Sequence, residues 1–115
     1  MSDLKTITKK VIEFRDARDW KQFHTPKDSA IALLSEATEV LDQFKWLNEK
    51  ETKKYIKDHK KEIADELSDV FFWVLLMAHD LNVELLSAFE QKMKENATKY
   101  PVEKARGRHT KYNKL

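Results

Sequence analysis

The sequence predicts an all-α fold, because it is poor in the residues that separate strands and rich in residues that favour helices. Its 115 residues include one Gly and two Pro, which is too few to punctuate a sheet with turns. Charged residues make up 37% and apolar residues 41% of the chain, a balance that is typical of amphipathic helices rather than of disorder. A chain of this length forms one domain around one core.

The first helix is expected from the start of the chain to about Trp20. Ser2 is a suitable N-cap for this helix. Apolar side chains then recur at helical spacing, at Leu4, Ile7, Val11 and Phe14. The segment KQFHTPKD, residues 21–28, is polar and interrupted by proline, so it is interpreted as a loop that leads into the next helix.

A second helix is expected from Thr25 to about Trp46. Thr25 is a favourable N-cap, Pro26 suits the first helical position, and Asp28 places an acid in the first turn. Asn48 followed by Glu51 is the next start signal, and it opens a stretch rich in lysine. That stretch forms either a short helix of its own or the exposed first half of a long helix that ends near residue 81.

Asn82 is expected to cap a last helix that runs to about Lys99, where Pro101 stops it. Four helices joined by short connections predict an antiparallel four-helix bundle. The run from Val70 to Ala78 is apolar on every side, and such a helix needs cover on every side. Because four helices of this size cannot easily supply that cover, we expect a subunit interface there and an oligomeric protein.

Two pairs of acids lie inside the most apolar stretches of the chain. Glu36 and Glu39 form one pair, and Glu66 and Asp69 form the other. Each pair is spaced i,i+3, so both acids of a pair project from one face of a helix. Four ionised carboxylates on faces that are otherwise apolar need something to cancel their charge. A divalent cation with oxygen ligands is the usual solution, so the pattern favours a magnesium site.

Other interpretations of these acids are weaker. One i,i+3 pair alone would more often be solvent-facing, but here two pairs are embedded among Leu, Val, Ile and Phe. A di-iron bundle needs Glu-x-x-His on two helices, and no histidine of this chain has a Glu three residues before it. The chain also lacks the glycines of a P-loop and the motif HExxH.

Each acidic face carries a tryptophan further along the helix. Trp46 follows the first acid pair, and Trp73 follows the second. The distance along a helix from acid to tryptophan resembles the reach of a nucleoside triphosphate from its phosphates to its base. Taken singly, each tryptophan at helical spacing is more often part of a core or an interface.

The chain resembles the MazG-like all-α nucleoside triphosphate pyrophosphohydrolases, and within them the dCTP pyrophosphatase branch. The matching segments are RDWKQFHTP (18–26), LLSEATEVLDQFKW (33–46), ELSDVFFWV (66–74), KMKENATKYPVEKARG (92–107), and KY at 111–112. They cover most of the chain in the order of the family. The chain has Ser35 where the broader family often has a Glu, which leaves four acidic ligands.

The resemblance implies a set of site residues. The metal ligands that it implies are Glu36, Glu39, Glu66 and Asp69, which would hold Mg²⁺, with Mn²⁺ as a substitute. The nucleotide-binding residues that it implies are Trp20, Gln22, His24, Trp46, Trp73, Lys92, Asn96, Lys99 and Tyr100. Glu39 is the candidate catalytic residue that orients the attacking water. The implied fold is the antiparallel four-helix bundle of the all-α NTP pyrophosphatases, assembled as a homodimer or homotetramer.

The implied reaction is hydrolysis of a (deoxy)nucleoside triphosphate, with dCTP as the model substrate, to the monophosphate and pyrophosphate. Residues 1–100 would form the helical catalytic domain, and the basic tail 101–115 would pack on or near the site. A basic tail is more often simply a solvated end. The alternative function is a non-catalytic helical module that binds nucleotides, nucleic acid or another protein, but such a module would not explain acids inside apolar helices.

Composition narrows the expected partners and compartment. The net charge of +2 is too small to argue for nucleic acid, and the run from Val70 to Ala78 is half the length of a membrane span. The chain has no cysteine, so it has neither disulfides nor thiolate metal sites. The N-terminal residues lack the apolar core of a secretory signal. We expect a cytoplasmic protein that binds neither nucleic acid nor membranes.

Overall fold

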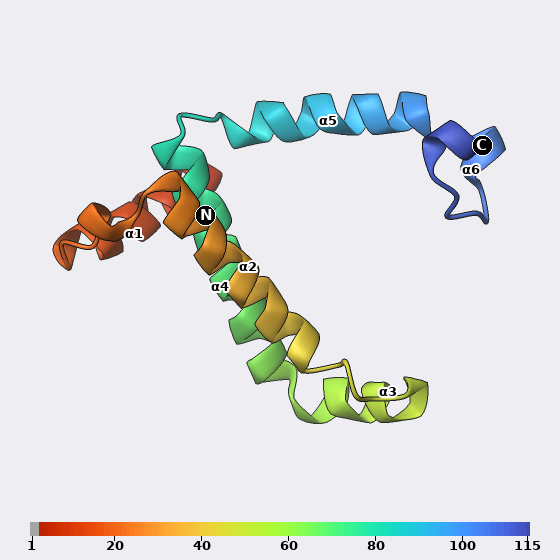
Figure 1. Cartoon of the computed structure of the whole chain (residues 1–115), viewed down its shortest axis with the longest axis horizontal. Helices are drawn as coiled ribbons and strands as arrows, with labels where there is room; N and C mark the ends of the chain where they lie inside the picture. The colour runs from red at the N-terminus through yellow and green to blue at the C-terminus, as the bar shows by residue number, and fades with distance from the viewer. Residues whose placement is uncertain (1–2) are drawn as a thin grey trace. The chain divides into compact units, whose positions relative to one another are not determined.

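The structure is a computed structural model that describes residues 3–115, and helices account for its regular structure (Figure 1). Within these residues there is no strand, so the predicted all-α class is confirmed. The chain divides into two compact units, one that ends at Asn82 and one that runs from Val83 to Leu115. Among the described helices, no single one is long and apolar enough to cross a membrane, although two consecutive helices, Lys60–Asp80 and Leu85–Lys99, meet that test by length and composition when taken together.

Helix α1 spans Leu4–Ala17, and Asp3 caps its start. The Asp3 carboxylate accepts a hydrogen bond from the Thr6 backbone N–H at 2.8 Å. The predicted cap, Ser2, lies outside the described residues. The helix ends before Trp20, where the prediction placed its end, because the backbone enters the left-handed region at Asp19 (φ 54°). Aspartate tolerates this conformation better than most residues, and a short 3₁₀ turn follows.

Helix α2 spans Pro26–Asp42 and begins as predicted. The Thr25 hydroxyl accepts a hydrogen bond from the Asp28 N–H at 3.1 Å, and Pro26 takes the first helical position. The prediction that the helix continues to about Trp46 is wrong. After Asp42 the chain tightens into turns, and the Gln43 side chain accepts a hydrogen bond from the Tyr55 hydroxyl at 3.0 Å.

The lysine-rich stretch forms a helix of its own, which decides between the two predicted alternatives. Helix α3 spans Glu49–Asp58 and starts with a capping box between Asn48 and Glu51. His59 interrupts the helical path with φ −126° and ψ 35°, and its ring stacks on Tyr55 with 4.1 Å between centroids. Helix α4, Lys60–Asp80, then begins and runs in a different direction from α3 (Figure 1).

Helices α2 and α4 form the centre of the first unit. They lie side by side and run in opposite directions, with α3 at the end where the chain turns from one to the other (Figure 1). Helix α1 packs on α4. The buried apolar side chains of this unit are Val11, Leu75 and Leu76. This antiparallel pairing brings the predicted acidic faces of α2 and α4 together.

The unit leaves many large apolar side chains exposed. In the apolar run of α4, Leu75 and Leu76 are buried, whereas Phe71 remains 43% exposed. Further exposed apolar residues of α2 and α4 are Ile31, Leu34, Leu41 and Leu67. Ile31, Leu34 and Leu41 lie on one face of α2, since they are spaced i, i+3 and i+10. The predicted subunit interface in this region stays a prediction.

The second unit contains helix α5, Leu85–Lys99, whose cap differs from the prediction. Glu84 caps the helix, and its carboxylate accepts a hydrogen bond from the Ser87 N–H at 2.8 Å. Asn82 was predicted to do so, but its backbone is left-handed (φ 57°) and its N–H donates to the His79 carbonyl. Asn82 therefore ends the preceding helix instead of starting the next one.

The basic tail forms two short elements within the second unit. Pro101 separates α5 from a short helix α6, Val102–Ala105, and a 3₁₀ turn closes the chain at Tyr112–Lys114. The Tyr112 ring packs edge-on against Tyr100 with 6.1 Å between centroids, and the Lys99 ammonium lies 4.8 Å from the Tyr112 ring centroid. The boundary between residues 1–100 and the tail, and the packing of the tail near the acids, stay predictions.

Candidate metal and nucleotide site

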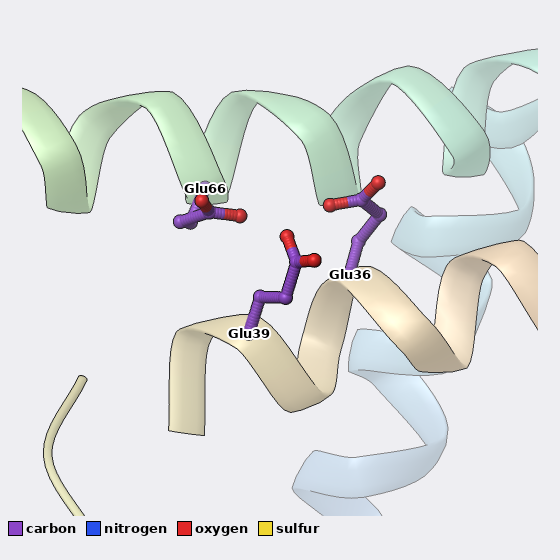
Figure 2. A group of neighbouring side chains, drawn as sticks. All are labelled: Glu36, Glu39 and Glu66. Carbon is purple, nitrogen blue, oxygen red and sulfur yellow. The ribbon is translucent and has the colours of Figure 1, made fainter. Parts of the chain in front are cut away.

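Three of the four predicted metal ligands meet between α2 and α4. Glu36 and Glu39 project from α2 towards Glu66 on α4 (Figure 2), and one carboxylate oxygen from each lies within 4.8 Å of the others. The i,i+3 spacing puts the two α2 acids on the same face, and the antiparallel packing places the α4 acid opposite them. Glu36, Glu39 and Glu66 are called the carboxylate cluster below.

The carboxylate cluster lacks the partners that buried oxygens require. Glu36 Oε2 and Glu66 Oε2 are buried, and neither has a hydrogen-bond partner. Burial, followed by the close approach and charge of the Glu39 carboxyl and then the charge of Asp69, raises the pKa of Glu36. The close approach of the Glu39 carboxyl, followed by burial and the charges of the neighbouring acids, raises the pKa of Glu66 to about 7. Without a cation, these groups tend to keep protons.

The chemistry of this cluster fits a hard divalent cation. Unpartnered buried oxygens are costly, and a cation would supply the missing partner for both of them. All of the donors are carboxylates, the ligand type that Mg²⁺, Mn²⁺ and Ca²⁺ prefer. Glu39 is exposed, so the cluster is open to solvent and could receive an ion together with a ligand.

Asp69, the fourth predicted ligand, lies beside the carboxylate cluster and lines the neighbouring cavity. Its charge contributes to the raised pKa of both Glu36 and Glu66. It is one of the residues that line a cavity of about 410 Å³. The residues that line this cavity are Lys10, Val11, Phe14, Trp20, Asp69, Phe72 and Trp73. Asp69 therefore connects the acidic site to a mainly aromatic one.

The aromatic cavity lies between α1 and α4. Phe14 of α1 packs edge-to-face on Trp20 and on Phe72, with centroid distances of 5.8 and 6.1 Å. Phe72 packs on Trp73 at 5.3 Å. The volume of the cavity, about 410 Å³, falls in the range of small-molecule pockets. Flat aromatic walls with one acid and one lysine at the border suit a planar polar ligand such as a nucleobase.

His24 extends this aromatic group from the loop before α2. Its ring packs edge-to-face on Trp73 with 5.1 Å between centroids, and its Nδ1 atom is buried without a hydrogen-bond partner. Burial, and then the positive charge of Arg15, lower the pKa of His24. The neutral imidazole offers one donor and one acceptor, so the unpartnered nitrogen is available to a ligand.

The other predicted nucleotide-binding residues lie elsewhere. Gln22 donates to the Asp19 backbone carbonyl and to its carboxylate, both at 3.0 Å. Trp46 is 84% exposed on the turn after α2 and does not line the cavity. The remaining four belong to the second unit, and they are Lys92, Asn96, Lys99 and Tyr100. The structure thus brings Trp20, His24 and Trp73 close to one cavity.

Sequence reasoning did not single out several residues of the cavity. Phe14 and Val11 were predicted only as apolar positions of the first helix, and Lys10 and Phe72 were not predicted as site residues. A signal for Arg15 was present, because it lies four residues after Val11 and so falls on the buried face of the helix. A charged residue on such a face needs a buried partner, which the sequence alone could not identify.

Known proteins resemble this chain over most of its length. The family model described as "MazG-like family" matches residues 31–115. The chain is 35% identical to dCTP pyrophosphatase 1 of Rattus norvegicus over 114 residues, which cover 97% of this chain and 67% of the relative. It is 32% identical to dCTP pyrophosphatase 1 of Homo sapiens, with the same shares of the two chains covered.

A solved structure also resembles the fold. The crystal structure of a pyrophosphatase from Archaeoglobus fulgidus matches with a TM-score of 0.82 and 29% identity, over 88% of this chain and 94% of that one. The resemblance inferred from the motifs is therefore confirmed by the family model, by the curated relatives and by the fold. The chain belongs to the MazG-like family.

Proposed function

We propose that this protein hydrolyses a (deoxy)nucleoside triphosphate, with dCTP as the model substrate, to the monophosphate and pyrophosphate in a magnesium-dependent reaction. Its enzyme class rests on the comparisons: the chain is a nucleoside triphosphate pyrophosphohydrolase, as the MazG-like match and the dCTP pyrophosphatase relatives support. The observation that carries the proposal is the carboxylate cluster next to an aromatic cavity, joined by Asp69.

The acids of α2 and α4 would hold the metal. Glu36, Glu39 and Glu66 form the carboxylate cluster, and Asp69 is the proposed fourth ligand. When bound, Mg²⁺ would neutralise the triphosphate and lower the pKa of a water molecule. Glu39 is exposed, and one of its carboxylate oxygens lies within 4.8 Å of one from Glu66. Its carboxylate is therefore the proposed group that orients the attacking water and accepts its proton.

The aromatic cavity would hold the base. Stacking of a base on an aromatic side chain contributes about 1–3 kcal/mol, and Trp20 and Trp73 both line this cavity. His24 would offer a neutral nitrogen to the edge of the base. Asp69 borders both the carboxylate cluster and the cavity. One nucleotide could therefore place its phosphates at the acids and its base in the cavity.

The remaining predicted residues are assigned to the phosphates and to the assembly. Lys92, Asn96, Lys99 and Tyr100 of α5 and its end are proposed to bind the phosphates, with the basic tail nearby. We propose that the bundle is completed in a homodimer or homotetramer. The exposed apolar faces of α2 and α4 support this proposal, because a monomer rarely leaves so many large apolar side chains in water. Trp46, exposed on its turn, would serve the pocket of a neighbouring subunit.

A nucleotide panel tests the proposed function. The purified protein is incubated with each common ribo- and deoxyribonucleoside triphosphate in the presence of Mg²⁺ or of a chelator, and released pyrophosphate is measured. We expect release that requires the metal and is fastest with dCTP or a close pyrimidine relative. Nucleotide binding without release of pyrophosphate from any triphosphate would favour the non-catalytic alternative.

The protein is proposed to act in the cytoplasm, without nucleic acid or membrane partners.

A further inference from the structure

Arg15 is a buried charge that the proposed reaction does not use. Its side chain is 1% exposed, the lowest value among the charged residues described. The guanidinium donates one hydrogen bond to the Asp80 carboxylate at 2.6 Å and another to Asp16 at 3.2 Å. Asp80 is the last residue of α4, so the pair joins the end of α1 to the end of α4 across 65 positions of sequence.

The pair is the single side-chain hydrogen bond between α1 and α4 among residues 3–115. Burial would lower the pKa of Arg15, but its bonds with Asp80 and Asp16 raise it. Burial would likewise raise the pKa of Asp80, but Arg15 lowers it. Both groups are therefore charged. Buried ion pairs are often replaceable by apolar residues without loss of stability, and their better-attested role is to fix one register between elements.

The two helices joined by this pair are the walls of the aromatic cavity. Helix α1 contributes Lys10, Val11 and Phe14, and helix α4 contributes Asp69, Phe72 and Trp73. Arg15 directly follows Phe14, whose ring contacts Phe72 on the opposite wall. A change in the Arg15–Asp80 contact would move the wall residues of α1 relative to those of α4. The carboxylate cluster lies on α2 and α4, so it does not depend on α1.

Arg15 also anchors the turn that carries the other aromatic residues. Its backbone carbonyl accepts hydrogen bonds from the Arg18 N–H at 3.1 Å and from the Trp20 N–H at 3.2 Å. Trp20 lines the cavity, and the chain continues from it to His24, which packs on Trp73. One residue thus holds both the position of α1 and the start of the segment that completes the pocket.

We propose that Arg15 and Asp80 are positioning residues that set the spacing and register of the two cavity walls, and thereby determine which base the enzyme accepts. The inference rests on the proposed function, because it assumes that the cavity holds the base. Neither residue lines the cavity itself. Their effect should therefore appear in substrate affinity and in discrimination between bases. Metal binding by the carboxylate cluster and kcat should be retained.

The test compares three variants with a matched control. Asp80→Asn keeps the size of the side chain but removes its charge. Arg15→Lys keeps the charge but loses the second hydrogen bond of the guanidinium. The double variant Arg15→Met/Asp80→Leu replaces the pair with apolar side chains. Asp58→Asn is the control, because it breaks an exposed ion pair, with Lys54 at 3.1 Å, on α3.

For Asp80→Asn we expect KM for the preferred triphosphate to rise about tenfold or more, and the preference for pyrimidine over purine substrates to narrow. The value of kcat should change less than about threefold, and Mg²⁺ affinity measured by calorimetry on the free protein should stay at the wild-type value. The KM of Arg15→Lys should lie between that of wild type and that of Asp80→Asn. The double variant should melt close to the wild-type temperature and still have the raised KM, and the control should match wild type.

Two results would overturn the proposal. One is a wild-type KM in Asp80→Asn and in the double variant, whatever their stability. The other is a rise in KM that is accompanied by equal losses of kcat and Mg²⁺ affinity, which is the pattern of general unfolding. If wild-type protein hydrolyses no triphosphate, the proposed function fails separately. The variants are then compared by deoxycytidine binding, followed by tryptophan fluorescence, where about tenfold weaker binding supports the positioning role and unchanged binding overturns it.

Discussion

The His24 imidazole and the Trp73 indole pack in a T-shaped arrangement, with 5.1 Å between the ring centroids and 71° between the ring planes. The two residues come from different elements, the loop before α2 and the middle of α4. His24 also has a buried nitrogen without a partner. This corner combines a ring for stacking with a free polar atom, which is what recognition of a base requires.

Removal of the stacking ring should weaken substrate binding. We expect Trp73→Ala to raise KM for dCTP by about tenfold or more, since stacking contributes about 1–3 kcal/mol, and His24→Ala to reduce the preference between bases. Steady-state kinetics on the nucleotide panel measure both effects. His59→Ala is the control, because its ring stacks on Tyr55 outside the cavity. Unchanged KM in Trp73→Ala would place the base elsewhere.

Neutralising one acid of the carboxylate cluster should abolish turnover without unfolding the protein. Glu66→Gln is expected to retain less than about a tenth of wild-type activity, which corresponds to about 1.4 kcal/mol of barrier. The melting temperature of the metal-free variant should hold or rise, because one repulsive charge is removed. Glu62→Gln, an exposed acid of the same helix, is the control. A variant with near-normal activity would argue against ligation by Glu66.

The same residue predicts how pH changes the stability of the metal-free protein. The close approach of the Glu39 carboxyl and burial raise the pKa of Glu66 from 4.5 to about 7. Between these values the folded chain binds a proton that the unfolded chain releases. The contribution of Glu66 is therefore greatest at low pH and is lost as pH rises through the folded pKa.

Thermal melts in the presence of a chelator check this dependence. From about pH 5 to about pH 8, the melting temperature of wild type should fall relative to that of Glu66→Gln. Saturating Mg²⁺ should remove this fall, because the ion binds the deprotonated acids. A difference between the two proteins that stays constant with pH in the chelator would contradict the assigned pKa of Glu66.

Subunit contact should be necessary for a complete site. Leu34→Lys introduces a charge into the exposed apolar face of α2 and should shift the protein towards monomers in light scattering.

Mixing inactive Glu66→Gln subunits with inactive Trp46→Ala subunits should restore part of the activity through hybrid sites. A wild-type monomer at micromolar concentration would defeat the proposed assembly. Confirmed hybrids without activity would confine the pocket to one chain.

The acidic part of the site was predictable from local pattern. Two i,i+3 pairs in apolar stretches place acids on helix faces, and a return of the chain between them places those faces together. The structure brings Glu36, Glu39 and Glu66 within reach of one ion. The start of α2 and of α3 was also predictable, because caps are local hydrogen bonds made by Thr25 and Asn48.

Features that depend on distant contacts were not predictable. The early end of α2 accompanies a bond between Gln43 and Tyr55 of another helix, so Trp46 leaves the face on which the pattern placed it. The Arg15–Asp80 pair joins residues 65 positions apart. Local spacing could show that Arg15 falls on a buried face, but it could not show which acid would meet it.

The phosphorus atom that water attacks distinguishes the proposed pyrophosphohydrolase reaction from other hydrolyses of a triphosphate. The wild-type protein is incubated with dCTP and Mg²⁺ in water enriched in heavy oxygen, and the products are analysed by chromatography and mass spectrometry. We predict dCMP and pyrophosphate, with the label in dCMP, because the proposed attack is at the α-phosphorus. Formation of dCDP and orthophosphate would contradict it.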